Sequence, residues 1–235
     1  MNIAFIPARG NSKTIKDKNL KKLGKITLLE NSIIIAKQSN FFEKIVISSE
    51  SDKILKIAKK YNVLTHKRKK YLSKDNSNVV DSAIDYLIKS KINTGILFLF
   101  QPTSPFVKKK HIKILLDKIA KSKYSSAQTI TEVEHNNHSW NQRSISPTQE
   151  VSFLKKNRFK FYNKQLKPNY YVFGNLVAVN ISKLIIKKNF FIKPSYGHII
   201  EWPYNFDIDN YDQLTIARLL IKNIKNLNNF FNKTK

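Results

Sequence analysis

The sequence predicts one α/β domain built around a mostly parallel β-sheet with helices on both faces. Short apolar runs rich in β-branched and aromatic residues alternate along the chain with longer segments of helical periodicity. A β-α-β-α-β-α-β-α-β alternation is typical of a three-layer sheet with right-handed crossovers. The length of 235 residues suits one such domain, and 41% of the residues are hydrophobic, which is enough to form its core.

The predicted strands are short runs of continuous apolar or β-branched character. The first, residues 3–6, stops at Pro7, and residues 95–100 form the most continuous apolar run, which indicates the central strand. The remaining strands are expected at residues 44–48, 63–64, 125–133, 170–179 and 198–202.

The predicted helices carry apolar residues at three- and four-residue spacing, so that one face of each can pack on the sheet. They are expected at residues 26–40, 52–61, 79–89, 108–121, 182–188 and 211–224. Residues 49–52, Ser-Glu-Ser-Asp, are expected to cap the second helix. The last ten residues or so are rich in Asn and Lys, and we expect them to fray.

Residues 134–169 interrupt the alternation with polar sequence that has no clear periodicity. A long irregular stretch inside a domain is typical of an insertion or a partner-binding arm. His135 and His138 lie three residues apart within it, in non-helical sequence, a setting that argues against a zinc site. We therefore expect a single domain, residues 1–235, with an arm at about residues 134–169.

The composition excludes several classes of protein. The chain has no cysteine, which excludes disulfides, thiolate metal sites and a cysteine nucleophile. It lacks an apolar run near the ~20 residues of a transmembrane helix, and its N-terminus lacks a secretory pattern. We therefore expect a cytoplasmic protein with no membrane partner. No Gly-x-Ser-x-Gly or comparable nucleophile motif is present, which argues against covalent catalysis.

The formal net charge of +27 suits a polyanionic ligand such as nucleic acid, a membrane surface or a nucleotide. The lysines, however, are spread over the whole chain, and no long basic tract with interleaved aromatic residues is present. Dispersed charge of this kind is typical of solvated helix faces. A nucleic-acid-binding protein remains an alternative supported by charge alone, and we expect no nucleic-acid partner.

The stretch after the first strand is the leading candidate for a binding site. Pro7 is followed by a small basic loop that contains Arg9, Gly10, Ser12 and Lys13. A buried strand that opens into such a loop commonly binds phosphate in α/β proteins, through backbone N–H groups and charged side chains. The loop has neither the GxxxxGK[ST] spacing of a phosphate loop nor the GxGxxG dinucleotide motif.

Asp207 and Asp209 place two carboxylates on one side of an extended segment, because side chains alternate there. Adjacent carboxylates repel each other unless a cation lies between them, and Mg²⁺ binds one or two carboxylates together with substrate phosphates. The alternative is that Asp209 or Asn210 simply caps the last helix. The two interpretations are compatible.

Two further segments carry polar groups. Residues 101–105, Gln-Pro-Thr-Ser-Pro, follow the predicted central strand in a stiff turn whose uncharged donors and acceptors suit a sugar or a base, or form a plain turn. Arg68 and Asp75 flank a polar loop and could reach a base or a phosphate, or lie at the surface as solvated residues. Ligands of such sheets bind beyond the carboxyl ends of the strands, where the opening loop and the 101–105 turn both lie.

Together, these segments resemble the acylneuraminate cytidylyltransferases, or CMP-sialic acid synthetases. The resemblance is carried by residues 6–13 (Ile-Pro-Ala-Arg-Gly-Asn-Ser-Lys), 18–20 (Lys-Asn-Leu), 46–49, 68–75, 101–105, and 207–209 with 212–214. These segments occur in the family's order and at its spacing over nearly the whole chain. The opening motif and the Gln-Pro-Thr-Ser-Pro segment are specific to the family, whereas the two aspartates alone are not.

The resemblance implies a nucleotidyltransferase (Rossmann-like) fold and a reaction in which CTP and a nine-carbon 2-keto sugar acid give a CMP-sugar and pyrophosphate. It implies Mg²⁺ as the cofactor, with Mn²⁺ as a substitute, and a homodimer in which the irregular insertion contacts the partner's site. Transfer of this kind depends on positioning and charge neutralisation rather than on a protein nucleophile.

The resemblance also implies a role for each matched residue. The nucleotide would be bound by Ala8, Arg9, Gly10, Ser12, Lys13, Asn19, Arg68 and Ser77. The sugar acid would be bound by Gln101, Thr103 and Ser104, and Mg²⁺ by Asp207 and Asp209. The residues that would act directly in catalysis are Arg9, Lys13, Lys18 and Asp209.

The chain departs from the family pattern at several positions. Asn11 and Thr14 stand where the opening motif has glycines, and a β-branched residue such as Thr14 tolerates a left-handed backbone poorly, which leaves the loop's shape open. Lys69 replaces a proline, Val79 replaces a serine or threonine, and Phe173 replaces the asparagine of an Asn-Gly pair near the sugar site. The sugar is therefore open among N-acetylneuraminate, legionaminate, pseudaminate and other nonulosonates. A divergent homologue that binds nucleotide without catalysing transfer is the second hypothesis.

Overall fold

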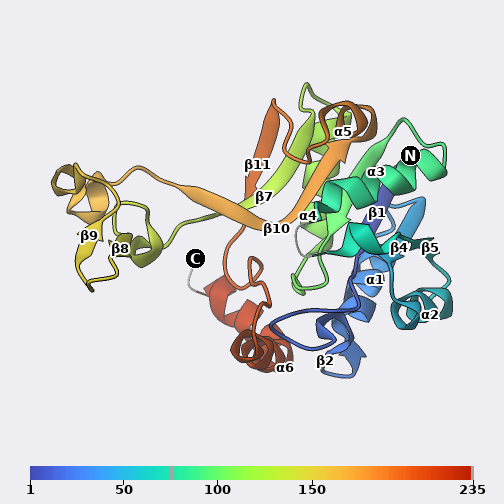
Figure 1. Cartoon of the computed structure of the whole chain (residues 1–235), viewed down its shortest axis with the longest axis horizontal. Helices are drawn as coiled ribbons and strands as arrows, with labels where there is room; N and C mark the ends of the chain where they lie inside the picture. Colours follow the sequence, from blue (N-terminus) through green and yellow to red (C-terminus); the bar gives the residue numbers. More distant parts are fainter. Residues whose placement is uncertain (75–76, 234–235) are drawn as a thin grey trace.

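The computed structural model describes residues 1–74 and 77–233, with residues 224–233 described by their backbone alone. Within these residues, seven strands form one sheet in the order β11-β7-β10-β6-β1-β4-β5 (Figure 1). The strands are β1 (Asn2–Pro7), β4 (Lys44–Ser49), β5 (Leu64–Lys67), β6 (Ile96–Phe100), β7 (Ser126–Glu132), β10 (Tyr171–Asn180) and β11 (Ser195–Ile199). β10 runs antiparallel to both of its neighbours, whereas the other neighbouring pairs of this sheet are parallel. The predicted α/β class with a mostly parallel sheet is confirmed.

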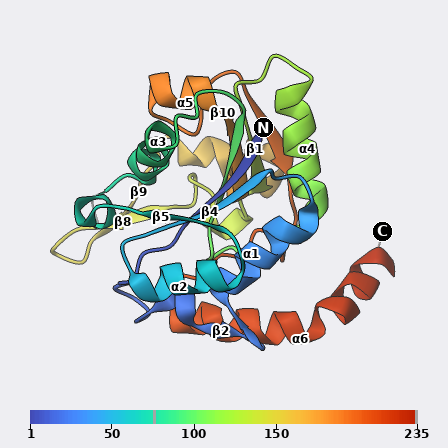
Figure 2. The same cartoon turned by 90° about the vertical axis from the view of Figure 1, so that its right-hand side faces the viewer.

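Helices pack on both faces of the sheet and make it the middle of three layers (Figure 2). One face is covered by α1 (Leu28–Ser39), α2 (Asp52–Lys60) and α4 (Lys109–Ala120), and the other by α3 (Val79–Lys89) and α5 (Ile181–Lys187). In β1, Ala4 and Ile6 face the first set of helices, while Ile3 and Phe5 face the second, and all four are fully buried. Burial on both faces explains why this strand is a continuous apolar run.

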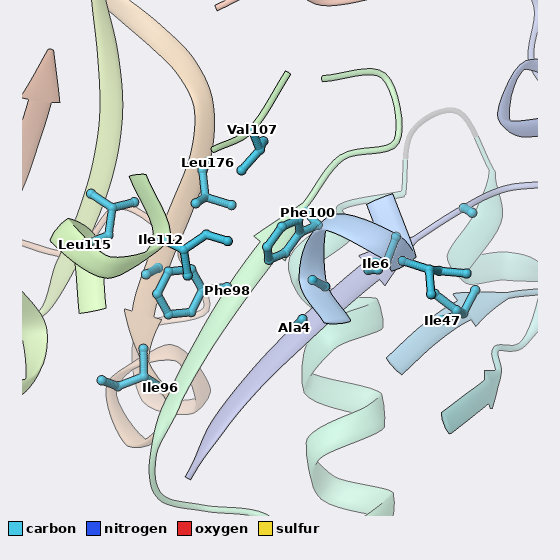
Figure 3. Packing of buried hydrophobic residues seen from close by; sticks show 14 of the residues in the cluster. Ala4, Ile6, Ile47, Ile96, Phe98, Phe100, Val107, Ile112, Leu115 and Leu176 are labelled. Atoms are coloured by element: carbon cyan, nitrogen blue, oxygen red, sulfur yellow. The ribbon is translucent and has the colours of Figure 1, made fainter. Parts of the chain in front are cut away.

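β6 is the fourth strand of the seven described, so the predicted central strand is confirmed. Its Phe98 and Phe100 point into the core on the face covered by α1, α2 and α4, which also contains Ile112 and Leu115 of α4 (Figure 3). Phe42 lies edge-on to both rings, with centroid distances of 5.2 and 5.5 Å. This packing fixes the carboxyl end of β6, from which the 101–105 turn begins.

The start of α1 differs from the prediction of residues 26–40. A short hairpin of β2 (Lys22–Leu23) and β3 (Ile26–Thr27) precedes the helix, with Gly24 at φ 70° in its turn. Thr27 then caps α1: its side chain accepts a hydrogen bond from the backbone of Glu30, whose carboxylate accepts one from the backbone of Thr27. This reciprocal cap begins the helix at Leu28.

The last strand and the last helix also differ from their predicted bounds. β11 lies at residues 195–199 rather than 198–202, because these residues pair in parallel with residues 126–130 of β7. α6 (Tyr211–Lys233) continues well past the predicted end at residue 224, so the expectation of a frayed tail is wrong up to residue 233. Apolar residues recur at positions 220, 224, 227 and 231 of the sequence, a helical spacing that the Asn- and Lys-rich composition obscured.

A third core cluster joins α6 to the opening loop. It contains Ile15 of that loop, Leu214 of α6, Phe106, and Ile208 of the acidic segment, residues 207–209. All four are almost fully buried. Residues far apart in the sequence are thereby packed against one another at the carboxyl edge of the sheet. This cluster holds the opening loop beside the 207–209 segment.

Residues 134–169 leave the sheet between β7 and β10 and project from the domain (Figure 1). They contain a hairpin of β8 (Arg143–Ile145) and β9 (Val151–Phe153), which the sequence did not predict because each strand is only three residues long. Within the arm, His138 stacks on Tyr170 and Trp140 stacks on Phe161, at centroid distances of 4.7 and 4.3 Å.

Candidate active site

The carboxyl ends of four neighbouring parallel strands, β5, β4, β1 and β6, meet at one edge of the sheet. Glu50, Arg68 and Gln101 directly follow β4, β5 and β6, and Arg9 lies two residues after the end of β1. A cleft of about 410 Å³ opens there. It is lined by Pro7, Arg9, Lys18, Asn19, Arg68, Leu72, Ser73, Lys74, Ser77, Val79, Gln101, Pro102, Thr103, Asp207 and Asp209.

The described lining is rich in positive charge. It contains four cationic residues, Arg9, Lys18, Arg68 and Lys74, and two carboxylates, those of Asp207 and Asp209. A concave surface with this balance attracts a polyanion that carries its charge at one end. Most of the predicted site residues line this cleft, namely Arg9, Lys18, Asn19, Arg68, Ser77, Gln101, Thr103, Asp207 and Asp209. The others, Ala8, Gly10, Ser12, Lys13 and Ser104, lie beside or behind it.

The opening loop leads from the cleft into a neighbouring cavity of about 260 Å³. Asn11, Ser12 and Lys13 line this second cavity, and Arg9, Ser73 and Lys74 line both. Asn19 is buried and its side-chain amide donates to the carbonyl oxygen of Arg9 at 2.9 Å, which holds the loop closed on itself. The predicted phosphate-binding side chains are thus distributed over two adjoining cavities.

Thr14 does not strain the loop. It is exposed and is not among the described residues with a positive φ; the left-handed residue here is Asp17, at φ 55°. Gly10 is required for a different reason, which is close approach: a Cβ on it would lie 2.8 Å from the Cβ of Ser51. The concern raised by the missing glycine at position 14 is thereby removed.

Ala8 and Gly10 lie behind the cleft. Ala8 is buried, and its N–H donates to the carbonyl oxygen of Ser48 at 2.9 Å, while the N–H of Gly10 donates to Oε1 of Glu50 at 2.6 Å. Neither residue lines either of the two cavities in the described part of the chain. Protein oxygens accept hydrogen bonds from both N–H groups, so neither group is open to the nucleotide that it was predicted to bind.

Glu50 is the site residue that the sequence reasoning missed. The stretch 49–52 was expected to cap α2, but the N-cap residue Ser51 makes no side-chain cap and Glu50 turns toward the loops instead. Burial by itself would raise the pKa of Glu50, but hydrogen bonds from Ser73, the backbone of Gly10 and Arg68 hold that pKa below its usual value. The signal available in the sequence was its position directly after a buried parallel strand.

Arg68 lines the cleft and is not a solvated surface residue: its side chain is 5% exposed and pairs with Glu50 at 3.0 Å. Its backbone N–H donates to the carbonyl oxygen of Ser49 at 3.1 Å, which continues the β4–β5 pairing by one residue. Ser77 also lines the cleft, and its hydroxyl donates to the carbonyl oxygen of Tyr71. The predicted contribution of Asp75 lies outside the described residues.

Asp207 and Asp209 both line the cleft, while Ile208 between them is fully buried, so the two carboxylates share one side of the segment as alternation requires. Asp207 accepts from the hydroxyl of Ser104 at 3.0 Å. Lys18 donates to Oδ1 of Asp209 at 3.1 Å and to the carbonyl oxygen of Ile208 at 2.9 Å.

The cap of α6 is made by Asn210. Its side chain accepts from the backbone of Gln213 at 2.8 Å, and Oε1 of Gln213 accepts from the backbone N–H groups of Asp209 and Asn210. Capping therefore uses Asn210 and leaves the carboxylate of Asp209 in the cleft. The predicted helix cap is confirmed with Asn210 as the capping residue, and the prediction of a Mg²⁺ site at the two carboxylates stays a prediction.

The 101–105 turn contributes Gln101 and Thr103 to the cleft. The backbone of Thr103 also binds the acidic segment, because its carbonyl oxygen accepts from Ile208 N–H at 2.9 Å. Ser104 differs from its predicted place at the sugar: its side chain is 2% exposed and donates to Asp207. It supports the carboxylate from behind rather than facing the cleft.

Other residues singled out in the sequence lie away from the cleft. His135 and His138 belong to the arm, where they line a small cavity with Lys164 and Lys167. Phe173 packs against the core on the face covered by α3 and α5 and lies edge-on to Phe191, with ring centroids 5.8 Å apart. In the described part of the chain, no three His, Cys, Asp or Glu side chains are grouped as metal ligands, and no helix is long and apolar enough to cross a membrane.

Comparison with known proteins agrees with this geometry. A family model described as cytidylyltransferase matches residues 3–200. The chain is 29% identical over 231 residues to a pseudaminic acid cytidylyltransferase of Campylobacter jejuni, an alignment covering 94% of this chain and 96% of that protein. It is also 29% identical over 217 residues to an N-acylneuraminate cytidylyltransferase of Escherichia coli, covering 92% of this chain and 51% of that protein. The chain thus spans about half the length of the second relative.

Among solved structures, the chain resembles a CMP:2-keto-3-deoxy-manno-octonic acid synthetase complexed with CTP. The TM-score is 0.68, and the match covers 94% of this chain and 98% of that one. The sequence identity is 11%, so this likeness shows the fold alone. The family model, which matches most of the chain, carries the assignment. The chain therefore belongs to the cytidylyltransferase family of nucleotidyltransferases.

Proposed function

We propose that this enzyme transfers CMP from CTP to the anomeric hydroxyl of a nonulosonic, sialic-acid-like sugar acid and releases pyrophosphate. The observation that carries the proposal is the cleft in which the cationic opening loop and the Asp207–Asp209 pair lie together. The named relatives, a pseudaminic acid and an N-acylneuraminate cytidylyltransferase, support the class of sugar acid.

The reaction needs no protein nucleophile. The oxygen of the anomeric hydroxyl bonds to the α-phosphorus of CTP, the bond from that phosphorus to the pyrophosphate oxygen breaks, and the hydroxyl proton passes to solvent. The protein's part is to align the two substrates and to neutralise the charge that develops. We assign Arg9, Lys13 and Lys18, which line the cleft or the neighbouring cavity, to the triphosphate, and fixed cations of this kind stabilise a departing pyrophosphate.

Asn19 and Arg68 are assigned to the cytosine and ribose, with Ser77 beside them, and Gln101 and Thr103 to the sugar acid. These assignments follow the resemblance to the family's motifs, and all five side chains line the cleft, which supports them. They leave the 101–105 turn close to the acidic segment, to which it is bonded through Thr103 and Ile208. The acceptor sugar and the carboxylates would then meet at the same end of the cleft.

The donor chemistry of Asp207 and Asp209 fits Mg²⁺. Two carboxylates on one side of a cleft provide the oxygen ligands this ion prefers, and substrate phosphates and water complete its shell in nucleotide enzymes. The described side-chain hydrogen bonds to this pair engage Oδ1 of each carboxylate. Bound there, Mg²⁺ would lower the pKa of the attacking hydroxyl and neutralise the departing pyrophosphate, and Mn²⁺ would substitute for it.

We also propose a cytoplasmic homodimer, because CTP is a cytoplasmic nucleotide and the arm exposes apolar surface. Phe159, Tyr162 and Ile145 are 71%, 67% and 61% exposed. An apolar surface of that kind on a projecting arm is suited to contact with a second subunit. The arm would contribute to the partner's site in such a dimer.

Pyrophosphate release from CTP and Mg²⁺ with a panel of nonulosonates tests the proposed activity. The panel includes N-acetylneuraminate, legionaminate and pseudaminate, and each is compared with a reaction that lacks the sugar acid. We expect release with at least one acid. No release with any of them, together with calorimetric binding of CTP, would favour the non-catalytic nucleotide-binding homologue. Unstrained backbone at Thr14 and the intact carboxylate pair speak against that alternative.

A further inference from the structure

Glu50 is the point at which three segments around the cleft converge. Its Oε1 accepts the N–H of Gly10 at 2.6 Å. Its Oε2 accepts from Nε and Nη2 of Arg68 at 3.2 and 3.0 Å and from the hydroxyl of Ser73 at 2.7 Å. Gly10 belongs to the opening loop, Arg68 follows β5, and Ser73 ends the 3-10 turn Lys70–Ser73. One carboxylate therefore connects the loop assigned to the triphosphate with the loop assigned to the nucleoside.

The ion pair at the centre of this arrangement is shielded from solvent. The side chains of Arg68 and Glu50 are 5% and 19% exposed. Shielding strengthens their attraction, and the two donors of Arg68 on one oxygen restrict the orientation of its guanidinium. These bonds use one N–H of Nε and one of Nη2, and they leave the other N–H of Nη2 and both N–H groups of Nη1. The bonds with Glu50 therefore determine in which direction the remaining donors of Arg68 point.

The opening loop approaches Glu50 closely. A Cβ on Gly10 would lie 3.3 Å from Oε1 of Glu50 as well as 2.8 Å from the Cβ of Ser51. A glycine at position 10 thus permits the short N–H bond to the carboxylate. Glu50 itself does not line the cleft in the described part of the chain, whereas Arg68 and Ser73 do.

We propose that Glu50 is a positioning residue for nucleotide binding, which holds Arg68 and the Gly10 segment in the geometry that accepts CTP. It acts through these neighbours and does not touch the nucleotide. This inference rests on the proposed cytidylyltransferase activity, whose substrate CTP it takes as the ligand.

The substitution Glu50→Gln tests the role of the carboxylate with little change of shape. An amide presents one oxygen and one NH₂ group. If its oxygen faces Gly10, its NH₂ meets the donors of Arg68 and Ser73; if it is reversed, its NH₂ meets the N–H of Gly10. Either orientation loses at least one charge-assisted hydrogen bond and sets donor against donor.

The matched control is Asp52→Asn. It removes the same single charge two residues away, but Asp52 is 80% exposed and pairs with the exposed Lys67. A general electrostatic effect of the lost charge would appear in both variants, whereas a positioning effect would appear in Glu50→Gln alone. Glu50→Asp keeps the charge and the acceptor oxygens and serves as the conservative variant.

CTP affinity is measured by calorimetry without the sugar acid, and KM for CTP and kcat are measured with it. We expect Glu50→Gln to weaken CTP binding and raise KM by about 10- to 100-fold, with kcat at saturating CTP within about threefold of the unaltered enzyme. Glu50→Asp should recover most of this loss, and Asp52→Asn should bind CTP within about twofold of the unaltered enzyme.

Unchanged CTP affinity in Glu50→Gln, a loss confined to kcat, or an equal loss in Asp52→Asn would overturn the proposal. Tighter CTP binding would also overturn it, because the carboxylate would then be a competitor for the phosphate position. Thermal unfolding verifies that Glu50→Gln is folded. If it is not, Ser73→Ala carries the test: a rise in KM for CTP of about 3- to 10-fold supports the proposal, and no change contradicts it. Failure of the unaltered chain to bind CTP would refute the proposed function as well as this inference.

Discussion

The ammonium group of Lys18 lies 3.1 Å from Oδ1 of Asp209 and donates a hydrogen bond to it. Lys18 is 14% exposed and Asp209 is 69% exposed, so the pair lies at the border between the packed third cluster and the open cleft. The same ammonium donates to the carbonyl oxygen of Ile208. The opening loop is therefore bonded to the acidic segment at the point where the triphosphate and the cation are proposed to bind.

Lys18→Met should lower kcat/KM for CTP by about 100-fold, because a cation next to the departing pyrophosphate is removed. The free energy of unfolding should change by no more than about 1 kcal/mol, since the partner carboxylate is open to solvent. Pyrophosphate release and thermal unfolding measure the two effects. Lys67→Met, which breaks the exposed pair with Asp52, is the control and should leave the kinetics unchanged. Activity near that of the unaltered enzyme would remove Lys18 from the triphosphate site.

Asp209→Asn should lower turnover by about 100-fold or more while the fold stays intact, because a metal-binding carboxylate is lost at an exposed position. The control is Asp212→Asn, an exposed residue in the first turn of α6. Both variants are compared by turnover and by their melting temperature. Turnover of Asp209→Asn near the unaltered value would exclude Asp209 from the metal site.

Removal of divalent cations by a chelator should abolish pyrophosphate release, and added Mg²⁺ should restore it, with Mn²⁺ as a substitute. In Asp207→Asn, the Mg²⁺ concentration for half-maximal activity should rise by about tenfold or more, since one anionic ligand is lost. A titration of activity against Mg²⁺ measures this shift. Full activity in the presence of the chelator would contradict the assignment of the carboxylate pair.

Stability should fall in mild acid because of His111. Burial, together with His198, Lys110 and Lys108 nearby, lowers its pKa to about 3. Its ring is 1% exposed, and its Nδ1 accepts from the backbone N–H of Lys108 at 3.3 Å, which requires the neutral form.

The sign follows from proton uptake. Between the unfolded pKa of about 6.5 and the folded value, the unfolded chain binds a proton that the folded chain does not, so stability is full above about pH 6.5 and is lost as the pH falls. The loss approaches a tenfold change in the folding equilibrium per pH unit. His111→Gln should flatten the dependence of denaturant unfolding on pH between about 6.5 and 5. An unchanged slope would show that His111 is protonated in the folded protein.

The helices and strands that the sequence predicted well are those with one unambiguous period. The helix predicted at residues 79–89 has these bounds in the structure, because Asn78 caps it through the backbone of Val80 and its buried face repeats cleanly. The strands 95–100 and 44–48 were found within a residue, since buried parallel strands are continuous apolar runs. Short pairings such as the β8–β9 hairpin leave no comparable pattern.

The sequence predicted which residues form the candidate site more completely than it predicted the hydrogen bonds that join them. Arg9 and Gln101 could be found because each follows a recognisable strand, whereas Arg68 was indicated by its polar loop and by the resemblance to the family. Glu50 follows a strand equally directly, but its acidic side chain next to serines suits a helix cap, and only the fold shows that it faces Arg68. Ser104 could not be separated from Thr103 by sequence, because both are hydroxyl residues in one turn and only the path of the backbone buries one of them.

The fate of the phosphorus atoms of CTP distinguishes transfer of CMP to a sugar acid from hydrolysis of the nucleotide. The enzyme is incubated with Mg²⁺, a nonulosonic acid that supports pyrophosphate release, and CTP labelled at either the α- or the γ-phosphorus. We expect the α-label to appear in a CMP-sugar and the γ-label in pyrophosphate, in equal amounts. Appearance of the γ-label in orthophosphate, with the α-label in CDP or free CMP and no labelled sugar, would contradict it.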